Sequence, residues 1–553
     1  MEKTQFKKKV DVNTRNLRQA LLESVRPMTF FFDPRHDFIP FFGNMMVGES
    51  FGNSHHPSFS MSHIPGRWLN ALLNIENTLG IEVDKQAIEH LRKWTYRSLE
   101  CTKLGFPACI NTTTMEAIPE TDLHNLREVM HALTALVKYR NDQHAYRLAL
   151  DLIEQVDTWY SYEQGKFLEE EWSRKTGGKL QKWAGTTRFD SPFPISFGRY
   201  IGALVKFYRA TGELCALQQA LKLKEVCFRD VLDQSGNYDV EVFGGHTHST
   251  TAMLSSLCQL GHTVQDHEIF ERVHRFMKNG LSKIALDFGW CVEGYYRTDC
   301  VGEINNTADI MEVCLALGQA GYPGYFAQAE CILRAHFLPA QLLDTSFIQE
   351  GFDSSIPETY CLASKSKGAF GFPCPFGHED HPGAIISFNW DIVGGGAGGL
   401  CEAVRAQCTT SAGLTSINLL FDYEDENFSF QNPYDHKNTA TLQIKNKTMQ
   451  FRIRIPTHCA DIRLTGAKWF SVGEWMYLYA AAPMGKVTID FDFKIIDKVY
   501  TFRENNFALR WHGEEVTNSN NDGKRLCFFD SLPAEKIGGF RDAELRDKEQ
   551  SNP

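Results

Sequence analysis

The stretch FNWDIVGGGAGGLCEAVRAQ, residues 388–407, is compatible with two different folds. Its glycines Gly394, Gly396 and Gly399 match the G-x-G-x-x-G fingerprint of a dinucleotide-binding loop, and Asp422 follows at about the spacing of the ribose-binding acid. A dinucleotide fold also requires a parallel strand–helix–strand unit around this loop. Alternatively, the glycines open the last helix of a helical domain. The rest of the chain decides between the two.

Six segments, this one included, share one pattern. A small or glycine-containing entry precedes apolar residues at i, i+3, i+4 and i+7, and a second amphipathic helix follows. The first helix of each pair is the more apolar, as expected for an inner ring. Six pairs at intervals of roughly 50–90 residues predict an (α/α)6 toroid over residues 31–410, after an N-terminal segment 1–30. The inner helices are expected within residues 62–80, 123–142, 196–213, 245–261, 302–321 and 394–407.

After residue 410 the pattern changes to short alternating segments. TATLQIKNKTMQFRIRIP and KVTIDFDFKII alternate apolar and polar residues between turn signals, which predicts an antiparallel β-sandwich over residues 411–533 and a charged tail over 534–553. Neither side of the glycines offers a parallel strand partner. The glycines are therefore expected in the entry loop of the sixth inner helix, where they would let the backbone approach a ligand or serve close packing.

Composition excludes several partners. A formal net charge of −11 argues against nucleic acid and anionic membranes, and no run of 18 apolar residues could span a bilayer. The 15 cysteines are scattered without a C-x-x-C pair, which suits reduced thiols. The start of the chain lacks the apolar stretch of a signal peptide, so a cytoplasmic location is expected, or a periplasmic one if a signal was removed. Association into a homo-oligomer is left open.

The order of the segments resembles the family 127 glycoside hydrolases (β-L-arabinofuranosidases) and their relatives, including the family 154 β-glucuronidases. The likeness is carried by GRWLNALLNIENTLG, HTHSTTAMLSSL, DFGWCVEG, ADIMEVCLALGQAGYPGYFAQAECILRAHFLPAQ and MQFRIRIP. It covers residues 62–503. The resemblance implies a glycoside hydrolase that acts on an oligosaccharide or glycoside in the pocket of the toroid.

The chain departs from this family at the metal site. The arabinofuranosidases hold zinc with a glutamate and three cysteines, one of which is the nucleophile. Here the motif at the fifth inner helix reads GEINN, with Glu303 but no cysteine at the family's offset. The second motif reads NWDIVGGG, with Trp390 and Asp391 where the cysteines would fall. No cofactor is expected, and zinc is disfavoured. Only a different register would restore cysteines, namely Cys300, Cys401 or Cys408.

Glycoside cleavage needs an acid that protonates the leaving oxygen and a second carboxylate that acts as nucleophile or base. The candidates are Glu293, Glu303 and Asp391. Glu293 stands among aromatic residues that could raise its pKa, whereas Glu303 lies near a helix N-terminus and Asp391 beside the glycines. Each also has a structural interpretation, as a loop carboxylate, a helix cap and a turn aspartate respectively.

Two histidines and three aromatic residues are candidate sugar contacts. His246 and His248 are spaced i, i+2 and do not share a helix face, which favours hydrogen bonds to substrate over a metal pair, with a structural role as the alternative. Aromatic side chains stack on sugars but are also ordinary core residues. The aromatic candidates are Trp290, Tyr296 and Trp390.

A uronic acid would call for a guanidinium, which binds a carboxylate through two hydrogen bonds. Arg297 is the first candidate, Arg188 the second and Arg67 a third, and a salt bridge to neighbouring acids is the alternative for each. The function expected from the sequence is removal of a terminal β-linked uronic acid. The alternatives are an arabinofuranosidase-like hydrolase of neutral sugars, an unsaturated-uronide hydratase or lyase, and a sugar-binding protein without activity.

Overall fold

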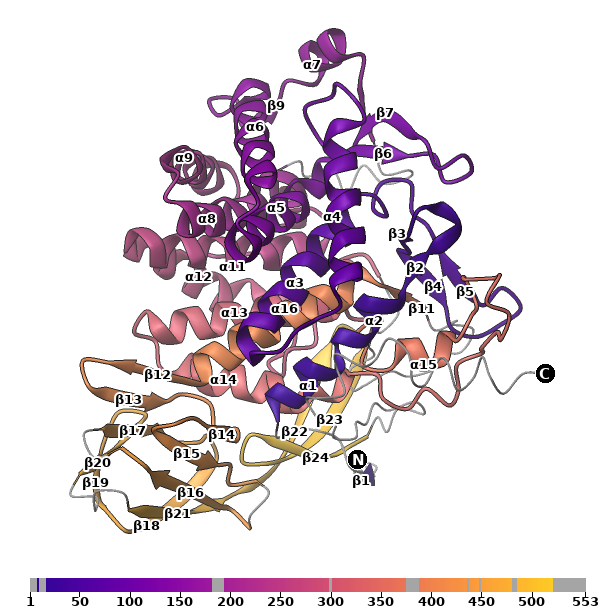
Figure 1. The fold of residues 1–553 in the computed structure, drawn as a ribbon. Helices are drawn as coiled ribbons and strands as arrows, with labels where there is room; N and C mark the ends of the chain where they lie inside the picture. Colours follow the sequence, from indigo (N-terminus) through magenta and orange to yellow (C-terminus); the bar gives the residue numbers. More distant parts are fainter. Residues whose placement is uncertain are drawn as a thin grey trace.

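Six inner helices surround a common axis in the computed structural model of the chain (Figure 1). Each packs on the next and the sixth packs on the first, so the ring is closed and the predicted toroid is confirmed. The structure describes residues 7–8, 16–181, 193–297, 301–373, 387–434, 437–446, 449–479 and 485–520. The inner helices are α3 (His63–Leu79), α5 (Leu126–Arg140), α8 (Arg199–Thr211), α11 (Thr247–Val264), α13 (Ile304–Gln319) and α16 (Asp391–Gln407).

Five of the inner helices are followed by an outer helix that packs on them. The sixth outer position is taken by α1 (Leu17–Glu23), which comes from the N-terminal segment and packs on α16. The side chain of Asn16 caps α1 by accepting a hydrogen bond from the Gln19 backbone at 3.0 Å. The ring is therefore completed from both ends of the helical region. The other outer helices are α4 (Lys85–Glu100), α6 (Gln143–Trp159), α9 (Leu214–Asp230), α12 (His267–Asn279) and α14 (Gly324–Ile332).

The glycine segment lies inside helix α16 rather than in an entry loop, contrary to the sequence-based expectation. The helix begins at Asp391, so the glycine amides do not form its free N-terminus. A Cβ on Gly395 would lie 1.8 Å from Asn305 Oδ1, and one on Gly399 would lie 2.9 Å from the Cβ of Ala308. The glycines thus allow α16 to pack closely on α13, as the close-packing alternative predicts.

The strand that precedes α16 excludes the dinucleotide interpretation. β11 (Ser387–Asn389) pairs antiparallel with β4 (Gly43–Met45), which in turn pairs with β5 (Gly52–Ser54). A dinucleotide unit would place this strand in a parallel sheet. Asp422 accepts hydrogen bonds from the backbone and the side chain of Asn432, at 2.7 and 2.8 Å, and so stabilises a turn.

Two five-stranded sheets form the C-terminal sandwich around their own apolar core, which includes Phe428, Phe451 and Ile489. Their pairings are antiparallel except for one parallel pair, β13 with β17. The first sheet has the order β12 (Cys408–Ser411), β13 (Leu414–Ile417), β17 (Gln450–Arg454), β20 (Trp475–Tyr479) and β19 (Lys468–Val472). The second has the order β14 (Tyr423–Glu424), β15 (Phe428–Gln431), β16 (Thr439–Ile444), β21 (Lys486–Phe493) and β18 (Cys459–Thr465).

A third sheet packs on the toroid instead of on the sandwich. It consists of β22 (Ile495–Phe502), β23 (Asn505–His512), β24 (Glu515–Ser519) and β1 (Lys7–Lys8). Its buried aromatic residues Phe502 and Phe507 belong to the core of the toroid. The Arg503 guanidinium donates hydrogen bonds to the backbone carbonyls of Tyr295 and Arg297. This sheet therefore supports the segment that leads into α13.

The remaining elements are short, and none of the described helices is both long and apolar enough to cross a bilayer. The predicted charged tail, residues 534–553, lies outside the described residues. The short helices are α2 (Val25–Phe30), α7 (Glu169–Thr176), α10 (Val240–Phe243) and α15 (Leu362–Ser366). The short strands are β2 (Phe32–Asp33), β3 (Ile39–Pro40), β6 (Ala108–Ile110), β7 (Ala117–Thr121), β8 (Tyr160–Ser161), β9 (Lys166–Phe167) and β10 (Lys179–Leu180).

A buried ion cluster joins the toroid to the sandwich. Arg454 on β17 pairs with Glu330 on α14 and, at 2.5 Å, with Glu514 in the turn between β23 and β24. All three side chains are fully buried. Glu330 also accepts a hydrogen bond from the Leu420 backbone at 2.7 Å. Because buried charges are tolerated only with partners, this cluster holds the two parts of the chain together in one geometry.

We predict that Arg454→Met lowers the thermal midpoint of unfolding by several degrees. The change leaves buried Glu514 without its cation and Glu330 with Arg334 alone, at 2.8 Å, and removing one partner of a buried pair costs about 3–5 kcal/mol. The matched control is Arg510→Met, because Arg510 pairs with Asp497 at the surface, where a pair contributes at most about 1 kcal/mol. Equal shifts in calorimetry for the two variants would contradict the role given to the cluster.

Candidate active site

All six inner helices contribute residues to the axis of the ring, and three of them present a polar stripe there. The stripes line a central pocket, and their residues follow one another at i, i+3 or i+4 and i+7, which places them on a single helix face. Because the rest of each helix is apolar, the stripes were not recognised in the sequence. The stripes of three helices are Arg67, Asn70 and Asn74 on α3, His248, Ser255 and Gln259 on α11, and Asn305, Asp309 and Glu312 on α13.

A buried carboxylate organises the charges of this centre. Glu128 on α5 has no exposed surface, and its Oε1 lies 3.0 Å from Nη2 of Arg67, 3.3 Å from Nε of Arg127 and within hydrogen-bonding distance of Arg199. Burial by itself would raise the pKa of Glu128, but the guanidiniums of Arg199, Arg127 and Arg67 hold it well below its ordinary value. Glu128 is therefore an anion that ties α3, α5 and α8 together. It is a residue that the sequence analysis missed.

Asp391 is the first residue of α16 and is kept ionised. Its Oδ2 lies 3.1 Å from Nε2 of His63 and 3.5 Å from Nε of Arg67. Burial opposes ionisation, but the contact with His63 and the charge of Arg67 lower the pKa of Asp391 below its ordinary value. His63 is held in turn by Asn125, whose Oδ1 is 3.0 Å from the ring Nδ1. The second carboxylate oxygen, Oδ1, has no hydrogen-bond partner among the described residues.

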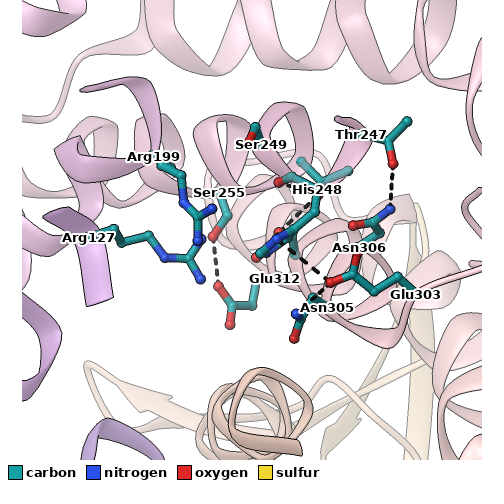
Figure 2. Close-up of polar contacts among 12 residues, drawn as sticks. Arg127, Arg199, Thr247, His248, Ser249, Ser255, Glu303, Asn305, Asn306 and Glu312 are labelled. Atoms are coloured by element: carbon teal, nitrogen blue, oxygen red, sulfur yellow. Dashed lines mark hydrogen bonds and ion pairs between the residues drawn. The ribbon is translucent and has the colours of Figure 1, made fainter. Parts of the chain in front are cut away.

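Glu303 stands at the start of α13 but does not cap the helix with its side chain. Its Oε1 accepts a hydrogen bond from Nδ2 of Asn305 at 2.6 Å and lies 3.8 Å from Nδ1 of His248 (Figure 2). Burial, together with the negative charges of Asp391 and Glu293, raises the pKa of Glu303 to about 8. The carboxyl group therefore carries its proton at neutral pH.

The centre thus holds two carboxyl groups in opposite protonation states. Glu303 is protonated, Asp391 is ionised, and the charge of Asp391 contributes to the raised pKa of Glu303. Pairs of titratable groups whose pKa values are driven apart are typical of acid–base catalysis. This arrangement can donate one proton and, at the same time, offer one carboxylate as a base or nucleophile. Both residues were candidates from the sequence, and the structure brings them together.

The segment that contains Glu293 and Arg297 lies at the edge of this centre. Arg297 Nη1 is 2.6 Å from Glu293 Oε2, and both side chains are partly exposed. Arg297 is therefore neutralised by its neighbour, which is the salt-bridge alternative considered from the sequence. Tyr296 is partly buried, with its ring 5.2 Å from that of Tyr295. Arg188 lies outside the described residues.

Two tryptophans proposed from the sequence as sugar contacts are core residues. Trp290 is 1% exposed and packs edge-on against Phe502 of the third sheet. Trp390 is fully buried, stacks on Phe31 at 3.8 Å between ring centres, and donates a hydrogen bond from Nε1 to Asn53 at 2.9 Å. Neither ring offers a face to a ligand. Aromatic character alone does not reveal which side of an element is buried.

The two histidines at the start of α11 both belong to the polar centre. His248 lies between Glu303 and Asp309, with Nε2 3.4 Å from Asp309 Oδ2. The His246 ring is 5.8 Å from that of His248, and its Nδ1 is 2.7 Å from the hydroxyl of Ser249. Burial and the nearby arginines lower the pKa of both, that of His246 to about 3. They are therefore neutral hydrogen-bonding groups at physiological pH.

The described residues around Glu303 do not by themselves make a zinc–thiolate site, and Cys300, which a different register would bring in, lies outside the described residues. Such a site needs several deprotonated cysteines beside the glutamate. In the part of the chain that the structure describes, the thiol near Glu303 is that of Cys291; burial raises its pKa, and Asn306 Nδ2 lies 3.3 Å from its sulfur. Among the described residues, one group of three side chains is close enough together to hold a metal ion, and it lies away from the central pocket. Its carboxylate, that of Asp33, already pairs with Arg35. That group consists of Asp33, His36 and His55.

Comparison with known proteins identifies the fold. No protein-family model and no curated protein matches the chain significantly. Three solved structures match over 93% of the chain: a glycoside hydrolase (TM-score 0.53, 11% identity, 84% of that chain covered), a family 127 β-arabinofuranosidase (0.55, 12%, 84%) and the family 127 β-L-arabinofuranosidase of Geobacillus stearothermophilus T6 (0.51, 10%, 86%). The resemblance seen in the sequence is therefore confirmed at the level of the fold.

We predict that Glu303→Gln removes a pH dependence of stability. The pKa of Glu303 rises from 4.5 in the unfolded chain to about 8 in the fold. The stabilising contribution of its proton to the free energy of unfolding is therefore complete below pH 4.5 and is lost as the pH rises through 8. The thermal midpoint of the variant, relative to that of wild type, should therefore increase between pH 5 and pH 9.

The control for this experiment is Glu424→Gln, which changes a side chain that is 73% exposed. Its midpoint should follow that of wild type at every pH. A constant difference between Glu303→Gln and wild type across the pH range would show that Glu303 is not held in its protonated form.

Proposed function

We propose that the protein is a glycoside hydrolase that removes a terminal sugar at the centre of the toroid. The observation that carries the proposal is the pairing of a protonated Glu303 with an ionised Asp391. The fold shared with family 127 glycosidases supports the same class of reaction. Glycosidases of most families use two carboxyl groups in these two states.

The roles follow from the partners of each carboxyl group. Glu303 protonates the leaving-group oxygen, and the hydrogen bond from Asn305 sets the orientation of its carboxyl group. His63 and Arg67 hold one oxygen of Asp391, which leaves the unpartnered Oδ1 to attack the anomeric carbon or to activate a water. The neutral rings of His246 and His248 are hydrogen-bond partners for sugar hydroxyls.

We propose a β-linked uronic acid as the sugar. Glu128 pairs with Arg67, Arg127 and Arg199, and Asp391 also contacts Arg67. A guanidinium donor that these two carboxylates leave open would bind a substrate carboxylate. Arg67 is the proposed partner, because its Nη1 has no hydrogen-bond partner among the described residues and it lines the pocket.

Arg67 takes the place of Arg297, the first candidate from the sequence, because the charge of Arg297 is already matched by Glu293.

The competing functions predict different results in a screen of aryl glycosides. A neutral-sugar hydrolase of the arabinofuranosidase type would cleave arabinofuranosides and would lose activity with chelators or thiol reagents. A hydratase or lyase would act on unsaturated or intact uronides with a change in ultraviolet absorbance. A sugar-binding protein would bind without turnover.

We predict that wild type cleaves aryl β-glucuronides and that the effect of Glu303→Gln depends on the leaving group. Without the acid, kcat/KM should fall about 10²–10⁴-fold for a leaving group of high pKa but much less for a nitrophenol, which departs without protonation. Asp391→Asn should reduce the rate for both substrates alike. Equal losses for the two leaving groups in Glu303→Gln would exclude Glu303 as the acid.

We predict that Arg67→Lys reduces the preference for a glucuronide over the matching glucoside. Lysine keeps the charge but cannot make the paired hydrogen bonds of a guanidinium. The ratio of the two kcat/KM values should fall at least about tenfold, or about 1.4 kcal/mol. Because Arg67 also contacts Asp391, the change should slow both substrates, and the ratio of the two kcat/KM values cancels that shared effect. The control Arg297→Lys should leave the ratio unchanged. A fall of the ratio in Arg297→Lys but not in Arg67→Lys would show that Arg297 binds the substrate carboxylate.

A further inference from the structure

The central pocket continues along the axis to the other end of the ring. The acid–base pair lies where the inner helices α13 and α16 begin. The same pocket is lined farther along by Lys206, Gln259, Glu312 and Glu402, which also line a depression at the end where the helices finish. A second depression at that end shares Lys206 and Glu402 with the pocket. We call the central pocket together with these two depressions the axial passage.

The walls of the central pocket, which forms the middle of the axial passage, are polar and carry no large apolar side chain. Apart from glycines, Ala252 is the one apolar residue among the described residues that line the central pocket. Gly398 on α16 faces open space, because a Cβ there would meet only Asn70 Nδ2, at 3.8 Å. An apolar plug would keep the axis dry, whereas polar walls retain water.

Several buried polar atoms along the axial passage have no hydrogen-bond partner among the described residues. Buried polar groups in proteins are almost always paired, and in a polar cavity the missing partner is ordered water. The atoms come from four of the inner helices, so the water that they require extends along the axis. They are Arg67 Nη1, His131 Nδ1, Gln259 Oε1 and Asn305 Oδ1.

A series of side chains that can exchange protons runs in the same direction. His248 lies 3.8 Å from Glu303, and Ser255 donates a hydrogen bond to Glu312 at 2.7 Å (Figure 2). His248 also lies 3.4 Å from Asp309. Burial raises the pKa of Glu312 to about 7, so this group changes its protonation near neutral pH. These groups follow one another from the proposed acid toward the far end of the ring, and water between Asp309 and Glu312 would complete the series.

We propose that the axial passage is a second entrance, through which water reaches the carboxyl pair from the far end while a sugar occupies the near end. The inference rests on the proposed function. When the bond to the leaving group breaks, Glu303 loses its proton to the leaving oxygen. The hydrolytic water then gives its hydroxyl to the anomeric carbon and its proton to a carboxylate of the pair. A sugar that fills the near end blocks that route, so the axial passage supplies the water.

The first test is a crystal structure of the wild-type protein at a resolution that shows ordered water. Waters should form a continuous file from Asn305 Oδ1 to Gln259 Oε1 and on to the surface at the far end. In Gly398→Leu, whose side chain projects into the passage, the file should be interrupted. A dry or closed axis in the wild-type protein would overturn the proposal, whatever its activity.

The second test is kinetic. Gly398→Leu should lower kcat on an aryl β-glucuronide about tenfold or more, while the Kd for D-glucuronic acid stays within about twofold of wild type. The control Gly398→Ala, which is too small to block the axis, should behave as wild type. An unchanged kcat with an interrupted water file would overturn the supply role. If wild type cleaves no glycoside, the proposed function fails, and the crystal structure still decides whether the axial passage exists.

Discussion

The structure depends on one buried carboxylate, that of Glu128, and on the three guanidiniums that surround it. Charges in the interior are tolerated only as satisfied groups, so the positions of α3, α5 and α8 are set by the requirement that their side chains meet. Arg67 is shared between Glu128 and Asp391, and through it the constraint extends to the start of α16. The chemistry of the centre is therefore built on the same contacts that align the inner helices.

Burial and neighbouring charges then drive the pKa values of the two reactive carboxyl groups apart. Asp391 contacts a histidine and a guanidinium, which stabilise its charged form, whereas Glu303 accepts a hydrogen bond from a neutral amide. In the same desolvated environment the first group stays ionised and the second keeps its proton. The nearby histidines are neutral for the same reason. The neighbours that each group meets at the axis, rather than its residue type, decide its protonation state.

Other parts of the chain hold this centre in place. The N-terminal helix α1 fills the outer position beside α16, and Arg503 of the third sheet binds the carbonyls of the segment before α13. The Arg454 cluster fixes the sandwich to α14. Each contact joins residues that are distant in sequence, so the start of α13 and the start of α16 are supported from several directions. Preorganisation of this kind is what a site that moves protons requires.

The sequence by itself determined the architecture, because the helical and strand periods are local properties that can be read along the chain. It also pointed to Glu303 and Asp391, since both stand at the start of an inner helix. Tertiary structure decided which neighbours these residues have: it buried Trp290 and Trp390, paired Arg297 with Glu293, and placed the glycines inside α16. Glu128, His63 and the polar stripes were missed because each helix looked apolar when read alone. Protonation states depend on charges from six helices that meet only at the axis, so they follow from the assembled ring and not from any single segment.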